Sequence, residues 1–291
     1  MATVRKSADG FILEEDGQPL GGVGFEISPT CPPEFLGDLP PEELYLRDLW
    51  LPWAGDWLAA GRQLIAGALA MLPDDAPERL QARTNAEVHP EHALRVELFD
   101  SLGLEVFQEK EGFVWSDPGE PVVVPDRLEF MTVDEAGRDR YRDVLAGVGE
   151  ATLDRNDFYY RSHMDPQDWG SVYMTFLEDA DAPMWLLGTL PDGEEVGFIA
   201  VSDFDGEGTA TIAFVGVLPP HRGNGYIDDL LAAGTAAARR DGFTAMLSDV
   251  DTENAPMIAA MERAGHHAGI RPWHLWHHVG RVHAMSASEE P

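Results

Sequence analysis

A short glycine-containing turn in the second half of the chain has the residue types needed to bind a phosphate group. The turn is Arg222-Gly223-Asn224-Gly225-Tyr226-Ile227. Two glycines without Cβ atoms let a ligand approach backbone N–H groups that point inward. A predicted helix follows at once and adds the positive end of its dipole. These features predict a site for a phosphate or pyrophosphate, although the glycines could also serve only to make a tight turn and to cap the helix.

Two aspartates stand in the first turn of that helix. Asp228 and Asp229 directly follow Ile227. Carboxylates stabilise a helix N-terminus when no ligand is present, but they repel a phosphate. They therefore weaken the pyrophosphate interpretation without removing it.

Histidines crowd the C-terminal part of the chain, at His266, His267, His274, His277, His278 and His283. Alternation in a predicted strand over residues 273–282 places His274, Trp276 and His278 on one face. A metal would need a ligand set of defined geometry, and adjacent histidines in a strand point to opposite faces. We expect no metal site here, and packing or surface roles are preferred. The alternative is that Trp273, His274 and Trp276 form a wall of a substrate pocket.

The elements that position the glycine turn form an ordered series of strands and helices. Hydrophobic periodicity and turn residues indicate this series along the second half of the chain. It comprises a strand over residues 128–133, a helical segment over 134–155, a hairpin of 184–188 and 196–201, a strand over 209–217, a helix over 225–240, a strand over 245–250, a helix over 256–263 and a strand over 273–282.

The first half of the chain repeats this order from its second strand onward, which predicts an internal duplication with a truncated first copy. The repeated elements are strands 11–14, 20–27 and 45–51, a helix over 56–72, a strand over 80–84, a helix over 93–101 and a strand over 105–115. The turn equivalent to the phosphate site contains Trp53, Gly55, Asp56 and Trp57 but no arginine. We interpret it as a degenerate copy that does not bind a phosphate.

Residues 118–127 carry three prolines, at positions 118, 121 and 125. Prolines at this density prevent a helix and make a stiff connector. We therefore predict a degenerate domain over residues 1–117, a linker over 118–127 and a ligand-binding, catalytic domain over 128–291.

The turn and its surrounding elements resemble the acyl-CoA-binding half of the GNAT superfamily of N-acetyltransferases. The signature of that family is Arg or Gln, two residues, Gly, one residue, then Gly or Ala. Arg222 and Gly225 match it, whereas Ile227 replaces the final small residue. Asn254 matches the family's Asn at the start of the next helix. The resemblance covers residues 128–282 well and 10–115 weakly.

The resemblance implies an α+β or α/β fold of two GNAT-like domains, each a mixed, mostly antiparallel sheet flanked by helices. It also implies acetyl-CoA, or another acyl-CoA, as co-substrate. The residues that would hold it are Val215, Gly216, Val217, Arg222, Gly223, Asn224, Gly225, Tyr226, Ile227 and Asn254.

Direct acyl transfer requires a neutral amine, and a free alkylamine with a pKa near ~10.4 must first lose a proton. The strand over residues 209–217 contains no Asp or Glu. The nearest candidate bases are Asp249 and Asp251, for which surface or loop-capping roles are the alternative. Many family members also carry a Tyr that protonates the departing thiolate, but Met261 stands at that position.

Charge narrows the possible partners. The chain of 291 residues has 52 Asp and Glu against 20 Lys and Arg, a formal net charge of −32. This charge disfavours nucleic acids and anionic membranes and favours a cationic substrate, although it could also be only a solvated acidic surface. The single cysteine, Cys31, excludes an intrachain disulfide and zinc sites made of several thiolates. No apolar targeting or spanning segment is evident, so we expect a cytoplasmic protein.

The sequence therefore predicts an N-acetyltransferase that moves an acetyl group from acetyl-CoA to a primary amine of a small cationic molecule or peptide, in a ternary complex. The first alternative is a non-catalytic acyl-CoA-binding or interaction module. A metal-dependent enzyme that uses the histidines is the second. The sequence indicates neither the identity of the amine nor the oligomeric state.

Overall fold

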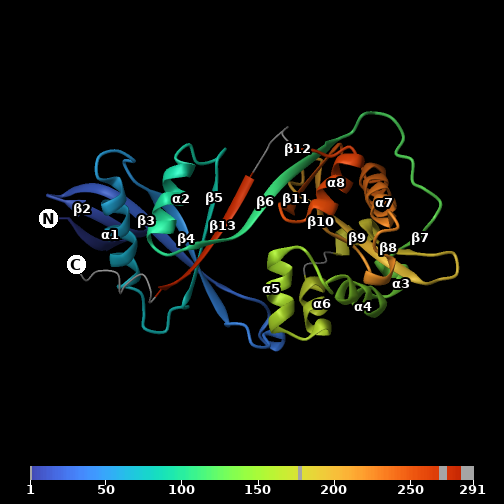
Figure 1. Cartoon of the computed structure of the whole chain (residues 1–291), viewed down its shortest axis with the longest axis horizontal. Coiled ribbons are helices and arrows are strands. Elements are labelled where there is room, and N and C mark those ends of the chain that lie inside the picture. Colours follow the sequence, from blue (N-terminus) through green and yellow to red (C-terminus); the bar gives the residue numbers. More distant parts are fainter. Residues whose placement is uncertain (1, 176–178, 269–273, 283–291) are drawn as a thin grey trace. The chain divides into compact units, whose positions relative to one another are not determined.

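The computed structural model describes residues 2–175, 179–268 and 274–282. The chain divides into two compact units. Unit 1 comprises Met1–Leu36, Pro40–Glu109 and His274–Pro291, and unit 2 comprises Gly37–Leu39 and Lys110–Trp273. Each unit contains its own series of strands and helices (Figure 1). Each also has its own hydrophobic core.

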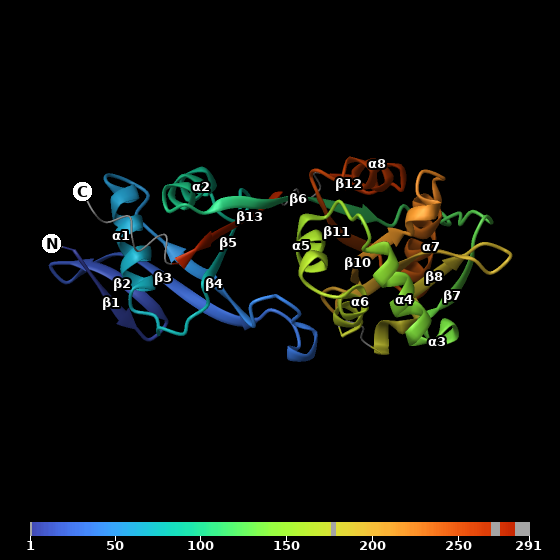
Figure 2. The same cartoon turned by 60° about the horizontal axis from the view of Figure 1, so that its bottom comes forward.

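Unit 1 is a sheet with strand order β1-β2-β3-β4-β5-β13. Its pairs are antiparallel except for β4 with β5, which are parallel. Two helices pack on one face, where Leu64 and Ile65 of the first and Leu98 and Phe99 of the second are fully buried (Figure 2). The elements are β1 (Thr3–Ser7), β2 (Gly10–Glu15), β3 (Gln18–Pro29), β4 (Glu42–Trp50), α1 (Trp57–Leu69), β5 (Arg79–Asn85), α2 (His92–Ser101) and β13 (His274–Arg281), with a 3₁₀ turn at Pro33–Phe35.

Unit 2 contains a sheet with strand order β6-β11-β10-β9-β8-β7, and the short β12 also pairs with β6. The pair β10–β11 is parallel and the others are antiparallel. The mixed, mostly antiparallel sheets predicted from the sequence are thus confirmed. The strands are β6 (Glu105–Ser116), β7 (Glu129–Thr132), β8 (Trp185–Thr189), β9 (Glu195–Asp203), β10 (Thr209–Val217), β11 (Ala245–Asp251) and β12 (His267–Ala268).

Helices cover both faces of the unit 2 sheet (Figure 1). Side chains alternate along β9, so that Ile199 lies against Gly234 of α7, while Phe198 contacts Tyr141 of α4 on the other face. The helices are α3 (Val133–Ala136), α4 (Arg138–Val148), α5 (Arg155–His163), α6 (Pro166–Met174), α7 (Tyr226–Arg240) and α8 (Ala255–Arg263), with 3₁₀ turns at Asp179–Met184 and Pro219–His221.

The division into units differs from the linker predicted at residues 118–127. Strand β6, the last strand of the first half, pairs with β11 from Lys110 to Ser116 and so belongs largely to unit 2. The last strand of the second half, β13, pairs instead with β5 of unit 1. The proline-rich segment lies within unit 2, because Val122 and Val124 pack against its core.

Other elements also differ from the prediction. The helical segment expected over residues 134–155 is interrupted at Gly137, whose φ of 86° ends α3, and α4 ends at Val148. Helices α5 and α6 were not predicted; Asp154 and Asp165 begin them by accepting hydrogen bonds from backbone N–H groups. The truncated first copy contains a further strand, β1, joined to β2 by a tight turn.

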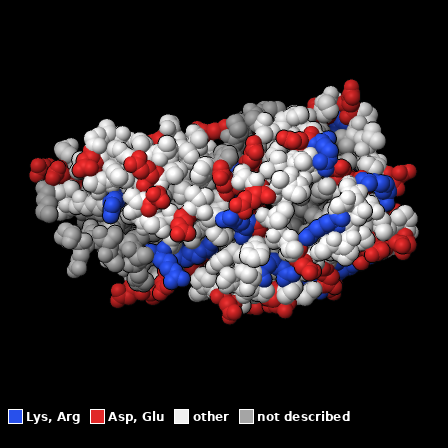
Figure 3. Space-filling view, in the orientation of Figure 1, with Lys and Arg blue, Asp and Glu red and all other residues white. Residues whose placement is uncertain are grey.

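Acidic side chains are spread over the face seen in Figure 3, with fewer basic side chains between them. This distribution agrees with the net charge of −32. Among the described residues, no helix has both the length and the apolar character needed to span a membrane.

Candidate functional site

A cavity of about 490 Å³ opens in unit 2 where β10 and β11 separate. The two strands pair only from Thr209–Thr211 to Ala245–Leu247, and each then continues along the cavity. The pairing of β10 with β9 also shifts register between Ile212 and Phe214, which indicates a β-bulge. The backbone of the second half of β10, including the predicted residues Val215, Gly216 and Val217, therefore lines the cavity.

The predicted phosphate turn lies at this cavity. Gly223 and Gly225 have φ values of 81° and 76°, in the left-handed region that favours glycine. Gly225 is the N-cap of α7, and no side chain caps this helix end. Tyr226 and Ile227 also line the cavity. The Asp228 N–H donates to the Gly225 oxygen at 3.2 Å, whereas the N–H groups of Tyr226 and Ile227, the first two of this 15-residue helix, have no intrahelical acceptor and are suited to a ligand.

Two residues of the predicted motif bond to the protein itself. The Arg222 guanidinium donates to the backbone oxygens of Val217 (3.0 Å), Val148 (2.9 Å), Glu150 (2.7 Å) and Ala151 (3.3 Å). Arg222 therefore ties the α4–α5 loop to the end of β10. The Asn224 side chain donates to the His221 oxygen at 3.0 Å and does not line the cavity.

The two aspartates in the first turn of α7 are both paired with arginines. The Asp229 side chain is 0% exposed and accepts two hydrogen bonds from Arg127. Asp228 pairs with Arg263 at 2.8 Å. Arg127 also donates to the oxygens of Asn224 (3.1 Å) and Gly225 (3.0 Å). The charges of Asp228 and Asp229 are therefore balanced by neighbouring arginines. The two carboxylates consequently repel a phosphate less than the sequence suggests.

The importance of Arg127 was not predicted, because it lies in the segment interpreted as a linker. It stacks over the Tyr226 ring at 5.2 Å. A lone basic residue beside prolines carries no signal in the sequence, since only the tertiary fold brings it to α7.

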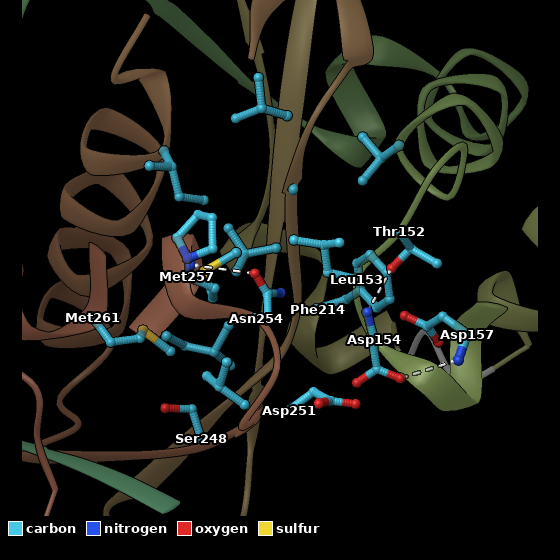
Figure 4. A pocket seen from close by; sticks show the side chains of 18 of the residues that line it. Thr152, Leu153, Asp154, Asp157, Phe214, Ser248, Asp251, Asn254, Met257 and Met261 are labelled. Carbon is cyan, nitrogen blue, oxygen red and sulfur yellow. Dashed lines mark hydrogen bonds between the residues drawn. The ribbon is translucent and has the colours of Figure 1, made fainter. Parts of the chain in front are cut away.

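A group of charged side chains lines another part of the cavity, and Figure 4 shows two of them, Asp154 and Asp157, side by side. Lys110 donates to Asp249 at 2.9 Å and forms an ion pair with Asp154 at 3.4 Å. Asp157 follows Asp154 by three residues in α5. We call Lys110, Asp154, Asp157 and Asp249 the carboxylate cluster. Although burial lowers the pKa of Lys110, the charges of Asp249 and Asp154 raise it above its ordinary value, so Lys110 is a stable cation.

Asp157 is the most perturbed member of the carboxylate cluster. Its side chain accepts a hydrogen bond from the Tyr173 hydroxyl, and the residue is only 6% exposed. Burial, together with the negative charge of Asp154, raises the pKa of Asp157 to about 7. A carboxyl group with this pKa can gain and lose a proton near neutral pH.

The two predicted bases occupy different surroundings. Asp249 is in the carboxylate cluster, where it pairs with Lys110. Asp251 is 2% exposed and accepts hydrogen bonds from the backbone N–H groups of Arg155 (3.1 Å) and Glu253 (2.9 Å). The loop-capping role that the sequence left open as an alternative therefore describes Asp251.

Figure 4 shows Asn254, Met257 and Met261, at or near α8, across the cavity from Asp154 and Asp157. The predicted ligand residue Asn254 is the N-cap of α8 and accepts from the Met257 N–H at 3.3 Å. Met261, which replaces the Tyr found in many family members, lines the cavity. So does Ser248, whose buried Oγ has no hydrogen-bond partner among the described residues.

These features fit an acyl-CoA. The helix end without a side-chain cap and the two left-handed glycines suit a pyrophosphate. The edge of β10 that no longer pairs with β11 and the orphaned Ser248 hydroxyl can bond to a ligand that passes between the separated strands.

The strand predicted over residues 273–282 is β13 (His274–Arg281) in the described part of the chain. Strand β13 belongs to unit 1, where Trp276 packs edge-on against His92 and His278 against Phe99. Trp273 lies outside the described residues. The predicted wall of Trp273, His274 and Trp276 therefore stays a prediction. Among the described residues, no group of three or more His, Cys, Asp or Glu side chains is arranged to hold a metal ion.

The equivalent turn in unit 1 is filled by aromatic side chains. The rings of Trp53 and Trp57 lie 5.6 Å apart, and both pack against the unit 1 core. The Arg95 guanidinium covers Trp53 at 5.4 Å. These contacts support the interpretation of this turn as a packing element.

Comparisons with known proteins agree with this geometry. Residues 150–266 match the model of the acetyltransferase (GNAT) family. A comparison with curated proteins gave no match. The matched residues include α5, the glycine turn and the residues that line the cavity other than Lys110 and Val148. The match implies acyl transfer from an acyl-CoA. The predicted resemblance to this family is thus confirmed over these residues.

Solved structures share the fold at low sequence identity. A GCN5-related N-acetyltransferase from Sphaerobacter thermophilus has a TM-score of 0.61 and 20% identity and covers 94% of this chain and 81% of its own. A tandem GNAT protein from the clavulanic acid biosynthesis pathway has a TM-score of 0.55 and 15% identity, covering 94% and 82%. A GCN5-related N-acetyltransferase from Kribbella flavida has a TM-score of 0.54 and 17% identity, covering 95% and 89%.

Proposed function

We propose that unit 2 is an N-acyltransferase that moves an acetyl group directly from acetyl-CoA to a primary amine of a small cationic molecule or peptide in a ternary complex. One observation carries this proposal. A single cavity connects the glycine turn at the start of α7 with the carboxylate cluster, along the opening between β10 and β11. The same cavity therefore contains a donor site that suits an anionic phosphate and an acceptor site that suits a cation.

On the donor side, the backbone from Gly223 to Ile227 would hold the pyrophosphate, and the backbone of Val215, Gly216 and Val217 would hold the acyl-bearing arm. When bound, acyl-CoA supplies an activated acyl group as a thioester. Backbone N–H groups in the opening are suited to stabilise the oxyanion that develops during transfer. Arg222 supports this side by fixing the α4–α5 loop.

On the acceptor side, three carboxylates face one lysine within the carboxylate cluster. This excess of negative charge favours an ammonium group, and the net charge of −32 favours the approach of cations in general. The acceptor is therefore a cationic amine, and neither a nucleic acid nor a membrane surface is proposed as a partner.

We further propose that the two units form a tandem pair in which only unit 2 binds acyl-CoA. The repeated order of elements and the resemblance to a tandem GNAT fold support the pair. The tryptophans that fill the unit 1 turn support a single donor site. We place the protein in the cytoplasm.

A second candidate is a binding module that holds acyl-CoA without catalysis. Met261 favours it, because a thioether cannot donate a proton to the departing thiolate. The two functions differ in whether free thiol forms.

The test is to incubate the full chain with acetyl-CoA and a panel of amines: a polyamine, an aminosugar and a lysine-containing peptide. We expect CoA thiol release together with an acetylated amine in the mass spectrum. Release of thiol without an amine product, or binding of acetyl-CoA with neither, would contradict N-acyl transfer, and the second of these results would favour the binding module.

A further inference from the structure

The carboxylates of the cavity differ in how fully their oxygens are already engaged. Asp251 accepts from two backbone N–H groups, and Asp154 caps α5 by accepting from the N–H groups of Asn156 (2.9 Å) and Asp157 (3.0 Å). Asp154 and Asp249 are both paired with Lys110. Asp251 and Asp154 therefore have structural roles, and the negative charge of Asp249, whose Oδ1 accepts from Lys110, is balanced by an ion pair.

Asp157 is different. One of its oxygens, Oδ1, accepts from the Tyr173 hydroxyl, whereas Oδ2 has no hydrogen-bond partner among the described residues. The residue is buried and lines the cavity, and Figure 4 shows it beside Asp154 on the acceptor side. The Tyr173 ring packs against Phe214 of β10, with centroids 5.0 Å apart. The pair is thus held against the strand along which the acyl group would lie.

From this geometry we infer that Asp157 is the general base of the transfer reaction, that its Oδ2 binds and deprotonates the acceptor ammonium, and that Tyr173 is its positioning residue. The inference rests on the proposed function and adds the residue that handles the proton. Asp249 and Asp251 were the candidate bases predicted from the sequence.

The Asp157 carboxylate accepts one proton from the acceptor ammonium, which leaves a neutral amine. The amine nitrogen then forms a bond to the acyl carbon, and the bond between that carbon and sulfur breaks. The second proton lost by the nitrogen passes to the departing thiolate, and the products are the amide, the free thiol and a protonated Asp157. Asp157 then releases its proton to solvent.

The surroundings of Asp157 determine where it titrates. Burial and the charges of Asp154 and Asp249 raise its pKa, whereas the Tyr173 hydrogen bond and the charge of Lys110 lower it, and the result is about 7. A free alkylamine ionises near ~10.4. A fall of kcat/KM as the pH drops through about 7, which we call the limb near pH 7, would therefore report the protonation of an enzyme group and not of the amine.

The experiment measures acetylation of the amines in the panel above, from pH 5 to pH 9, for the full chain and for two variants. Asp157→Asn should lower kcat by roughly 10²- to 10⁴-fold, the usual contribution of a general base, and should lose the limb near pH 7. It should still bind acetyl-CoA in calorimetry, because Asp157 is not in the glycine turn. Tyr173→Phe removes a hydrogen bond that favours the carboxylate, so the limb should move to higher pH.

Asp249→Asn serves as the matched comparison, since it also removes one carboxylate of the carboxylate cluster. We expect a higher KM for the amine with the limb near pH 7 retained. An Asp157→Asn variant that keeps kcat within a few fold and keeps the limb would overturn the role of Asp157. If instead the unchanged chain acetylates no amine of the panel, the proposed function itself fails.

Discussion

The ion pair between Arg127 and Asp229 allows a quantitative test of how the start of α7 is built. Asp229 is 0% exposed, whereas Arg127 is 45% exposed. Arg127→Met removes the cation and leaves a buried carboxylate without its partner. Removal of one member of a buried pair costs about 3–5 kcal/mol. Because Arg127 is partly exposed to solvent, water can replace part of the lost interaction. We therefore expect a smaller loss of unfolding free energy, roughly 2–3 kcal/mol.

The assay is calorimetric unfolding of the full chain, in which a loss of this size lowers the Tm of the unit 2 transition by about 4–10 °C. The double variant Arg127→Met with Asp229→Asn is the control, because it leaves no unpaired charge and should recover most of the loss. The assignment of a buried charge balanced by Arg127 would be refuted by either of two results. The single variant would unfold at the same Tm as the unchanged chain, or the double variant would have a Tm no higher than that of the single variant.

Three further predictions follow from the structure. Gly197→Ala should destabilise unit 2 by about 1–3 kcal/mol in urea unfolding, because its Cβ would clash with the backbone oxygen of Gly216; an unchanged midpoint would contradict the close approach of β9 and β10. Asp157→Asn should stabilise the chain more at pH 8 than at pH 4, because a carboxyl pKa raised from 3.8 to about 7 makes the folded state bind its proton more tightly and stability falls as pH rises through this window; an equal gain at both pH values would show that Asp157 titrates normally. Added salt should lower kcat/KM for a cationic amine and leave kcat nearly constant, because steering by exposed charges is screened beyond ~10 Å at 0.1 M; a rate indifferent to salt would reduce the acidity to a surface property.

The donor side of the site could be predicted from the sequence because its signals are local. Strand β10 was predicted with its observed bounds, Thr209–Val217. The glycines of the turn have positive φ angles that other residues rarely adopt, and α7 has a clear apolar stripe. Each of these features can be read within about fifteen neighbouring residues.

The acceptor side could not be predicted because it is assembled from distant segments. Lys110 reaches Asp249 only because β6 pairs with β11, and their positions differ by 139 residues. Asp157 and Tyr173 belong to two short helices, and α5 shows almost no amphipathic pattern: Asp157 is its only buried residue. The sequence also did not predict that β6, the last strand of the first half, pairs in unit 2, or that β13, the last strand of the second half, pairs in unit 1. A strand's sequence does not specify its partner.

The central claim, that the glycine turn of unit 2 binds acyl-CoA, is tested most directly by titration calorimetry with acetyl-CoA. The unchanged chain should bind one molecule per chain. Gly225→Ala, the control for the strain of a left-handed backbone, should bind more weakly, and Gly225→Asp should not bind although it folds, because a carboxylate then stands at the pyrophosphate site. Two acetyl-CoA molecules per chain, or undiminished binding by a folded Gly225→Asp variant, would contradict the account.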